Sequence, residues 1–132
     1  MPQTAVDILL VEDNEGDVAL VKQSLRECEF AVNLRIARDG EEALHILGDA
    51  AYAPHLVILD LNLPKVPGLT VLELAHRRET AFVIFSSSCS SEETKRALQL
   101  GARACVQKPI DITDFIRAIC SMVETAAAGV AS

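Results

Sequence analysis

The sequence predicts an α/β fold in which five parallel strands form one sheet with helices on both of its faces. Short apolar runs, typical of strands buried on both faces, alternate with longer segments whose apolar residues recur at helical spacing. This alternation occurs five times, and no linker or internal repeat interrupts it. A length of 132 residues also fits one compact domain with an aliphatic core.

The apolar runs give the five strands in order. They are predicted at Asp7–Val11, Ala31–Ile36, Leu56–Leu59, Phe82–Phe85 and Ala104–Val106. The second run has the weakest apolar signal, because its apolar and polar residues alternate.

The segments between and after the strands give the helices. They are predicted at Asp17–Cys28, Glu41–Leu47, Leu69–His76, Glu92–Leu100 and Ile112–Thr125. Each carries apolar residues three or four positions apart, as expected of helices that pack on a sheet. The small residues at 126–132 predict either a flexible tail or an extension of the last helix.

Charge and composition exclude several function classes. Twelve Lys and Arg residues against 19 Asp and Glu residues give a net charge of −7, which argues against binding to nucleic acid or to an anionic membrane. The chain starts without basic residues, and its first apolar run is too short for a signal peptide or a membrane span. We therefore expect a cytoplasmic protein.

The four cysteines form no metal or disulfide motif. Cys28, Cys89, Cys105 and Cys120 lie 61, 16 and 15 residues apart, without C-x-x-C or a histidine pair at zinc spacing. The prediction is four reduced thiols and no zinc site.

Three carboxylates follow predicted strands. Glu12 and Asp13 come directly after the first strand, and Asp60 follows the third. Ligands of open parallel sheets bind beyond the carboxyl ends of the strands, so these acids are expected to meet there. Such a cluster is tolerable around a divalent cation, and its oxygen ligands suit Mg²⁺. The alternative is that Asp13 or Asn14 caps the first helix and Asp60 caps a loop.

A hydroxyl and an ammonium group are predicted at the same edge. Ser86 ends the fourth strand, and Lys108 follows the fifth. Both groups can contact a phosphoryl group. The alternatives are a serine run that caps the next helix and a lysine that is simply solvated.

These residues in this order resemble the receiver domain of two-component response regulators, over nearly the whole chain. The matching segments are Ile8–Asn14, Ala37–Leu44, Asp60–Pro64 and Gly101–Ala102 before Lys108. The resemblance implies a flavodoxin-like (βα)5 sheet of order 2-1-3-4-5, with residues 1–125 as the receiver domain, and the length of 132 residues predicts no effector domain.

The resemblance also assigns roles within the site. Asp60 is implied as the phosphoacceptor, and Mg²⁺ as a cofactor held by Asp13, Asp60 and the backbone carbonyl of Asn62, with Glu12 acting mostly through water. The aspartyl phosphate then decays slowly by hydrolysis. The chain would accept a phosphoryl group without being a turnover enzyme.

Further roles concern switching. Ser86 and Lys108 are implied as contacts of the phosphoryl group, while Asn62 and Ser88 line the path of the hydrolytic water. Receivers usually have an aromatic ring three residues before the lysine. Here that position is Cys105, so no ring at this position reports activation, and a small apolar thiol is predicted at the edge of the core.

The resemblance extends to backbone details and partners. It implies a cis Lys108–Pro109 peptide, and the short 76–81 segment predicts a trimmed third helix. The implied partner is a histidine kinase or a phosphotransfer protein. The segments Glu12–Val18 and Asp60–Pro64 are similar to regulators paired with phytochrome-type kinases. A homodimer through the last helix is also predicted, with the interface residues Phe115, Ile116, Ile119 and Met122.

Three other functional interpretations compete with that of a phosphoacceptor receiver. A haloacid dehalogenase-type phosphatase needs a second acid two residues after the nucleophile, where this chain has Asn62. A degenerate receiver that only binds partners would lack Asp13, Asp60 or Lys108, and all three are present. A Rossmann-type nucleotide site is disfavoured because Gly16 stands alone after the first strand.

Overall fold

The computed structural model describes residues 5–131, in which strands and helices alternate along the chain. The strands are β1 (Val6–Val11), β2 (Val32–Ala37), β3 (Leu56–Leu59), β4 (Ala81–Ser86) and β5 (Ala104–Gln107). The helices are α1 (Glu15–Glu27), α2 (Gly40–Leu47), α3 (Gly68–Ala75), α4 (Ser91–Gln99) and α5 (Ile112–Ala131). All ten elements overlap the predicted segments.

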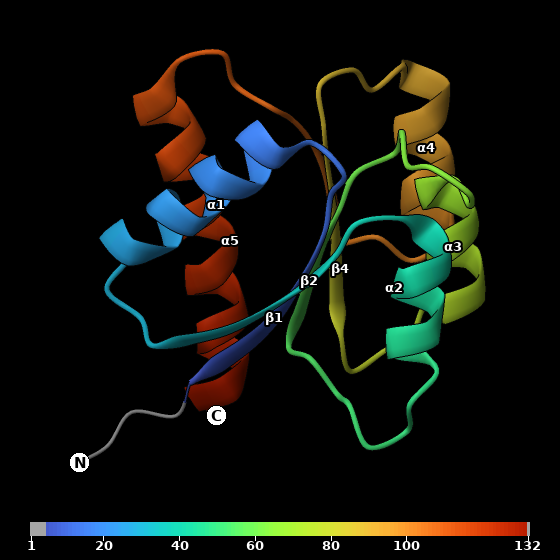
Figure 1. The fold of residues 1–132 in the computed structure, drawn as a ribbon, viewed down its shortest axis with the longest axis horizontal. Helices are drawn as coiled ribbons and strands as arrows, with labels where there is room; N and C mark the ends of the chain where they lie inside the picture. The colour runs from blue at the N-terminus through green and yellow to red at the C-terminus, as the bar shows by residue number, and fades with distance from the viewer. Residues whose placement is uncertain (1–4, 132) are drawn as a thin grey trace.

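The five strands form one parallel sheet in the order β2-β1-β3-β4-β5, so the predicted fold class is confirmed. Helices α1 and α5 cover one face of the sheet, and α2, α3 and α4 cover the other (Figure 1). Every strand is connected to the next by a helix, as a parallel sheet requires. The carboxyl ends of all five strands therefore lie at one edge.

Strand register places the carboxylates side by side. Val11, the last residue of β1, pairs with Ala37 of β2 and with Leu59 of β3. The backbone N–H of Asp60 donates to the Val11 carbonyl at 3.1 Å, and Glu12 N–H donates to the Ala37 carbonyl at 2.9 Å. The residues that follow β1 and β3 thus emerge next to each other.

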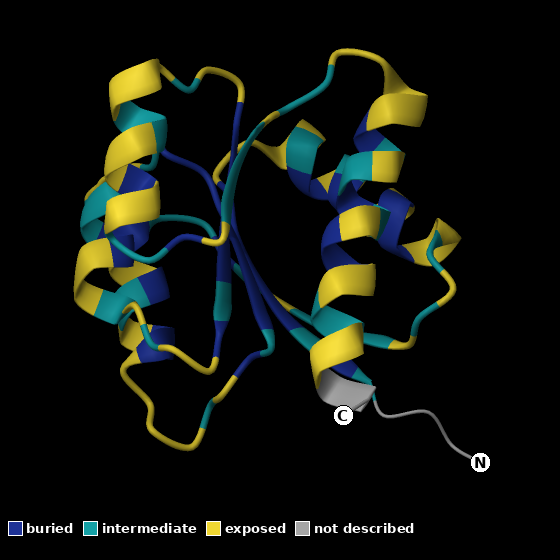
Figure 2. Ribbon diagram, turned by 180° about the vertical axis from the view of Figure 1, so that it is seen from behind, coloured by how far each residue is buried: buried dark blue, intermediate teal, exposed yellow. Residues whose placement is uncertain are grey.

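The core has two halves, one on each face of the sheet (Figure 2). Successive strand residues point to opposite faces, so Leu9 and Val11 pack under α2–α4 whereas Ile8 and Leu10 pack under α1 and α5. Because both faces are covered, β1 and β3 are apolar throughout their central residues, which is why they were recognisable as short apolar runs.

Three of the four predicted interface residues belong to this core. Phe115, Ile119 and Met122 are buried beneath α5, and the Phe115 ring packs edge-on against Phe85 at 5.0 Å between centroids. These three side chains are not available for a dimer interface, because the apolar side of α5 packs against the sheet. Ile116 is half-buried and remains accessible.

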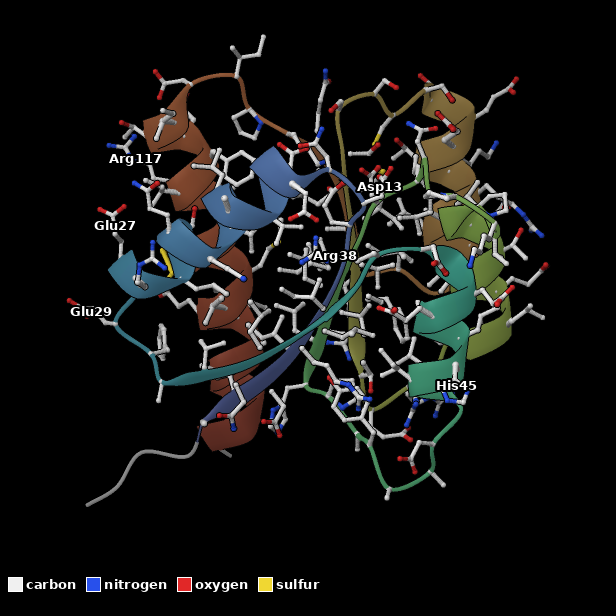
Figure 3. All side chains as sticks on the ribbon, viewed as in Figure 1. Asp13, Glu27, Glu29, Arg38, His45 and Arg117 are labelled. Atoms are coloured by element: carbon white, nitrogen blue, oxygen red, sulfur yellow. A yellow bond between two sulfur atoms is a disulfide. The ribbon has the colours of Figure 1, made fainter. Side chains whose placement is uncertain are left out.

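The prediction of four reduced thiols is wrong. Cys28, after the last turn of α1, forms a disulfide with Cys120 of α5, and their Cα atoms are 5.4 Å apart. The bond lies beside Glu27 and Glu29 (Figure 3). The two cysteines are 92 positions apart in sequence, so only the packing of α1 against α5 reveals the pair. Cys89 and Cys105 are free thiols.

The described backbone corrects one expectation and adds to two others. The Lys108–Pro109 peptide is trans, so the implied cis bond is wrong. Trans is the ordinary preference of an X–Pro bond by about 0.5–1 kcal/mol, and Lys108 reaches the acidic cluster in this isomer. Helix α3 has only eight residues, and α5 continues past Thr125 to Ala131.

Between residues 5 and 131, no helix combines the length and apolarity that crossing a membrane requires. The prediction that the chain starts without a signal peptide falls partly on residues 1–4, which lie outside the described part.

Candidate functional site

The three predicted carboxylates meet at the carboxyl edge of the sheet. Glu12 and Asp60 are buried, with exposed fractions of 3% and 7%, whereas Asp13 is exposed. One carboxylate oxygen of each residue lies within 4.8 Å of the others. Figure 3 shows Asp13 at the end of the molecule where the loops that follow the strands gather. Two buried acids and one exposed acid thus form a cluster that reaches the surface at Asp13.

Lys108, the residue that follows β5, brings one positive charge into this cluster. Its Nζ donates to Glu12 Oε1 at 2.6 Å and to Asp60 Oδ2 at 2.9 Å. It also donates to Asp17 Oδ2 at 2.9 Å. The Lys108 side chain is only 7% exposed, so its charge is matched by the carboxylates rather than by water. The alternative of a solvated lysine is thereby excluded.

Asp17 is a member of this cluster that the sequence analysis missed. It lies in the first turn of α1, and its backbone N–H is capped by the side chain of Asn14 at 2.9 Å. An acid in that turn is also what the helix dipole favours, which explains why the residue looked like an ordinary helix start. The available signal was its position four residues after Asp13, on the helix that leaves the site.

The second oxygen of Asp60 is held from two other directions. Ser86 Oγ, at the end of β4, donates to Asp60 Oδ1 at 2.9 Å, and the backbone N–H of Asn62 donates to the same atom at 3.2 Å. Ser86 is fully buried. Lys108 on one oxygen and Ser86 with Asn62 on the other therefore fix the orientation of the carboxylate.

These contacts set the charges. Burial raises the pKa of Glu12 from 4.5 to about 7, although the hydrogen bonds from Lys108 and Asn14 act in the opposite direction. Burial opposes the charge of Asp60 as well, but the hydrogen bond and charge of Lys108 outweigh it and hold the pKa of Asp60 below its ordinary value. Asp60 is therefore ionised at neutral pH, while Glu12 is close to its titration midpoint.

Lys108 stays protonated because the same carboxylates favour its charged form. Burial alone would lower its pKa, but the hydrogen bonds to Glu12, Asp17 and Asp60 raise the pKa above the ordinary value for lysine. The cluster thus carries one fixed cation and at least two carboxylates, an excess of negative charge that favours a cation.

The donor set fits a hard divalent cation. Glu12, Asp13 and Asp60 supply carboxylate oxygens, the ligand type that Mg²⁺ prefers, and the exposed side leaves room for the water it retains. Helix α1 is capped by Asn14, so Asp13 is not consumed as a cap, and no described side chain pairs with its carboxylate. This observation favours the metal site over the capping alternative.

Two further predicted residues, Ser88 and Cys105, lie after β4 and in β5. Ser88 is exposed in the segment between β4 and α4. Cys105 is half-buried at the edge of the core, where its sulfur accepts a hydrogen bond from Thr94 Oγ1 at 3.6 Å. A small thiol therefore occupies the position at which receivers usually carry an aromatic ring.

Comparison with known proteins agrees with this geometry. Residues 8–120 match the family model of the response regulator receiver domain. A probable chemotaxis protein CheY from Rhizobium etli is 30% identical over 118 residues, which covers 86% of this chain and 89% of that protein.

Two solved structures are similar in fold and sequence. The bacteriophytochrome response regulator AtBRR is 37% identical with a TM-score of 0.70, over 90% of this chain and 93% of that one. The Mn²⁺-bound form of the response regulator Rcp1 is 27% identical with a TM-score of 0.79, over 88% of this chain and 90% of that one.

Proposed function

This chain belongs to the response regulator receiver domain family, and we propose that it accepts a phosphoryl group on Asp60 from the phosphohistidine of a histidine kinase or phosphotransfer protein. The observation that carries the proposal is the environment of Asp60. The carboxylate is ionised, fixed through both oxygens, and lies beside a lysine and a cluster of acids suited to a metal.

The proposed reaction is an in-line displacement. A carboxylate oxygen of Asp60 attacks phosphorus, the phosphorus–nitrogen bond of the donor breaks, and the imidazole leaves. Lys108 keeps Asp60 ionised before attack and compensates charge on the phosphoryl oxygens during it. The Ser86 hydroxyl donates a hydrogen bond to the Asp60 carboxylate, so it also lies beside the incoming phosphoryl group. Asp13, Asp60 and the backbone carbonyl of Asn62 would hold Mg²⁺, with Glu12 acting mostly through water, and the ion would supply further neutralisation of the phosphoryl oxygens.

Phosphorylation changes the partners of Lys108 and Ser86. Both donate to Asp60 in the unmodified chain. An acyl phosphate has no carboxylate charge left on Asp60, so both donors gain a stronger acceptor in the phosphoryl oxygens. Movement of Ser86 toward that group would pull the segment 87–90, which joins β4 to α4. The signal would then leave through protein contacts on that face.

The lifetime of the phosphorylated state depends on access for water. Asn62 and Ser88 are both exposed and follow Asp60 and Ser86 by two positions. We propose that their side chains border the approach of the hydrolytic water. Asn62 offers no carboxylate to activate that water, which favours slow decay over phosphatase-like turnover.

The proposed kinase is of the phytochrome type. The similarity to AtBRR, a bacteriophytochrome response regulator, supports this partner. Phosphotransfer from a panel of purified histidine kinases, compared at early time points, tests it. A phytochrome-type kinase should label the chain faster than the other kinases, and equal labelling by all of them would contradict the assignment.

The central test is phosphorylation with a small phosphodonor such as acetyl phosphate. Intact mass spectrometry should show one added phosphoryl group in the presence of Mg²⁺, and none after chelation by EDTA. Asp60→Asn should abolish the addition, whereas Asp49→Asn, an exposed acid after α2, should not. Persistent labelling of Asp60→Asn would refute the assignment of the phosphoacceptor. Continuous turnover of a phosphate ester would favour the phosphatase alternative.

A second copy of the chain is a further proposed partner, through the outer face of α5. Ile112 is 58% exposed and Ile116 is half-buried one turn later, so this pair replaces the buried members of the predicted interface. Sedimentation velocity should show a dimer for the wild-type chain and a monomer for Ile116→Glu. A monomeric wild-type chain, with and without beryllofluoride, would contradict self-association.

A further inference from the structure

The second pair of cysteines lies in contact between the β4–α4 segment and β5. Cys105 is the second residue of β5 and pairs in register with Ile84, while Cys89 precedes α4 by two positions. Their sulfurs are 3.0 Å apart, with the Cys105 thiol donating to Cys89 Sγ. Both residues are half-buried free thiols, so each is partly accessible to a small reagent.

We propose that Cys89 and Cys105 form a redox modification site, at which a small-molecule disulfide such as glutathione disulfide converts the two thiols to an intramolecular disulfide. The pair needs little rearrangement for this. A disulfide bond is about 2.05 Å long, so the sulfurs must approach by about 1 Å. The site is separate from the bond between Cys28 and Cys120 and does not depend on the proposed phosphoacceptor function.

The surroundings of the two sulfurs differ and assign their roles. Thr94 Oγ1 donates to Cys105 Sγ at 3.6 Å, so the Cys105 sulfur has a hydroxyl partner. Cys89 instead lies close to the negative charge of Glu93, and burial raises its pKa to about 12. Cys105 is therefore the attacking sulfur, and Cys89 is the thiol that resolves the intermediate.

The steps balance in atoms and electrons. The Cys105 thiolate attacks one sulfur of glutathione disulfide, which forms a mixed disulfide and releases one glutathione thiolate. Cys89 sulfur then attacks Cys105 sulfur, its proton passes to the departing glutathione sulfur, and the second glutathione leaves. The protein dithiol is oxidised by two electrons, and the small disulfide is reduced to two thiols.

The new bond would join a loop to a strand. Cys89 lies in the segment 87–90, between Ser86 and the capped start of α4, where Ser90 and Glu93 form a capping box. Cys105 is fixed in the sheet by its pairing with β4. Oxidation would therefore restrain this segment against β5, and backbone amides at 87–90 should exchange hydrogen more slowly in the oxidised chain.

The test uses the folded full chain, treated first with reduced glutathione and then with glutathione disulfide. Remaining thiols are alkylated, and tryptic peptides are identified by mass spectrometry. Cys89 and Cys105 fall on separate tryptic peptides, residues 79–95 and 104–117. We expect these peptides to become cross-linked and alkylation of both cysteines to be lost. The bond between Cys28 and Cys120, on peptides 27–35 and 118–132, is an internal control for oxidation.

Two serine variants test the order of attack. Cys89→Ser should stop at a glutathione adduct on Cys105, and Cys105→Ser should carry neither adduct nor cross-link. Serine is nearly isosteric with cysteine, and circular dichroism checks that both variants fold. The proposal is overturned if Cys89 and Cys105 stay fully alkylated while the Cys28–Cys120 cross-link forms. An adduct on Cys89 in Cys105→Ser, with none on Cys105 in Cys89→Ser, would overturn the assigned roles.

Discussion

At the scale of single residues, the chemistry of the site rests on how Lys108 is shared. Its ammonium group contacts three carboxylates that come from the end of β1, the start of α1 and the end of β3. Three acids around one cation leave negative charge in a partly buried place. This excess of negative charge suits the divalent cation that the proposed phosphoacceptor function requires.

Lys108→Ala should therefore destabilise the metal-free chain. Removal of the cation leaves Glu12 and Asp60 buried with uncompensated charge, which costs about 3 kcal/mol of unfolding free energy. Mg²⁺ should restore part of this loss. Urea denaturation followed by circular dichroism, with Mg²⁺ and with EDTA, measures both effects. Lys95→Ala, an exposed lysine of α4, should change stability by less than about 0.5 kcal/mol. Equal stability of the two variants would contradict a buried ion cluster.

Glu12 should make metal binding depend on pH. A cation binds the ionised carboxylate, and burial raises the pKa of Glu12 to about 7, so the proton competes with the metal near neutrality. Affinity for Mg²⁺ is expected to rise about tenfold between pH 6 and pH 8, as the ionised fraction of Glu12 increases. Calorimetric titration measures it. Glu12→Gln should flatten the dependence, and a wild-type affinity independent of pH would contradict the role of Glu12.

At the scale of elements, the start of α3 packs directly on the two residues that follow β3, Asp60 and Leu61. A Cβ at Gly68 would lie 2.1 Å from the carbonyl oxygen of Asp60 and 2.8 Å from Leu61 Cα. The N–H of Gly68 donates to the Leu61 carbonyl at 2.9 Å, which fixes this approach. Helix α3 thus supports the backbone of Asp60. Any side chain at Gly68 must displace either the start of α3 or the backbone of Asp60 and Leu61.

Gly68→Ala should lower stability by about 1–3 kcal/mol, because backbone atoms cannot yield as a flexible side chain can. It should also slow phosphorylation, since Asp60 moves with its carbonyl. Gly129→Ala is the matched control. A Cβ there meets nothing within 4 Å, and alanine gains up to about 1 kcal/mol over glycine in a helix interior. Chemical denaturation of both variants should give opposite signs, and a neutral Gly68→Ala would contradict the close packing.

The central strands were predictable from the sequence because they are buried on both faces, whereas the helix ends were not. Strands buried on both faces must be apolar throughout, so β1, β3 and β4 stand out in the sequence, and their ends predicted Glu12, Asp60 and Ser86 at one edge. Helix ends depend on weaker local signals. Helix α5 continues past Thr125 because Ala126 and Ala127 pack against the core and Ala128 is exposed without penalty, which spacing alone does not decide.

At the scale of the whole molecule, the contacts that sequence reasoning missed are those made by helix packing. Asp17 contacts Lys108 because the first turn of α1 lies next to the residue that follows β5, and Cys28 bonds to Cys120 because α1 packs against α5. Neither pair has a spacing signature, since 91 and 92 residues separate the partners.

The Cys28–Cys120 bond closes most of the chain into one loop, and this predicts a measurable share of its stability. A cross-link over 92 residues removes chain entropy from the unfolded state equivalent to about 4.6 kcal/mol. A reducing agent should therefore shift the urea midpoint of the wild-type chain downward, and a double variant with Cys28→Ser and Cys120→Ser should start at the lower midpoint and ignore the reductant. The double variant Cys89→Ser and Cys105→Ser should keep the full wild-type response. A wild-type midpoint that reductant leaves unchanged would mean that this bond does not constrain the chain in solution.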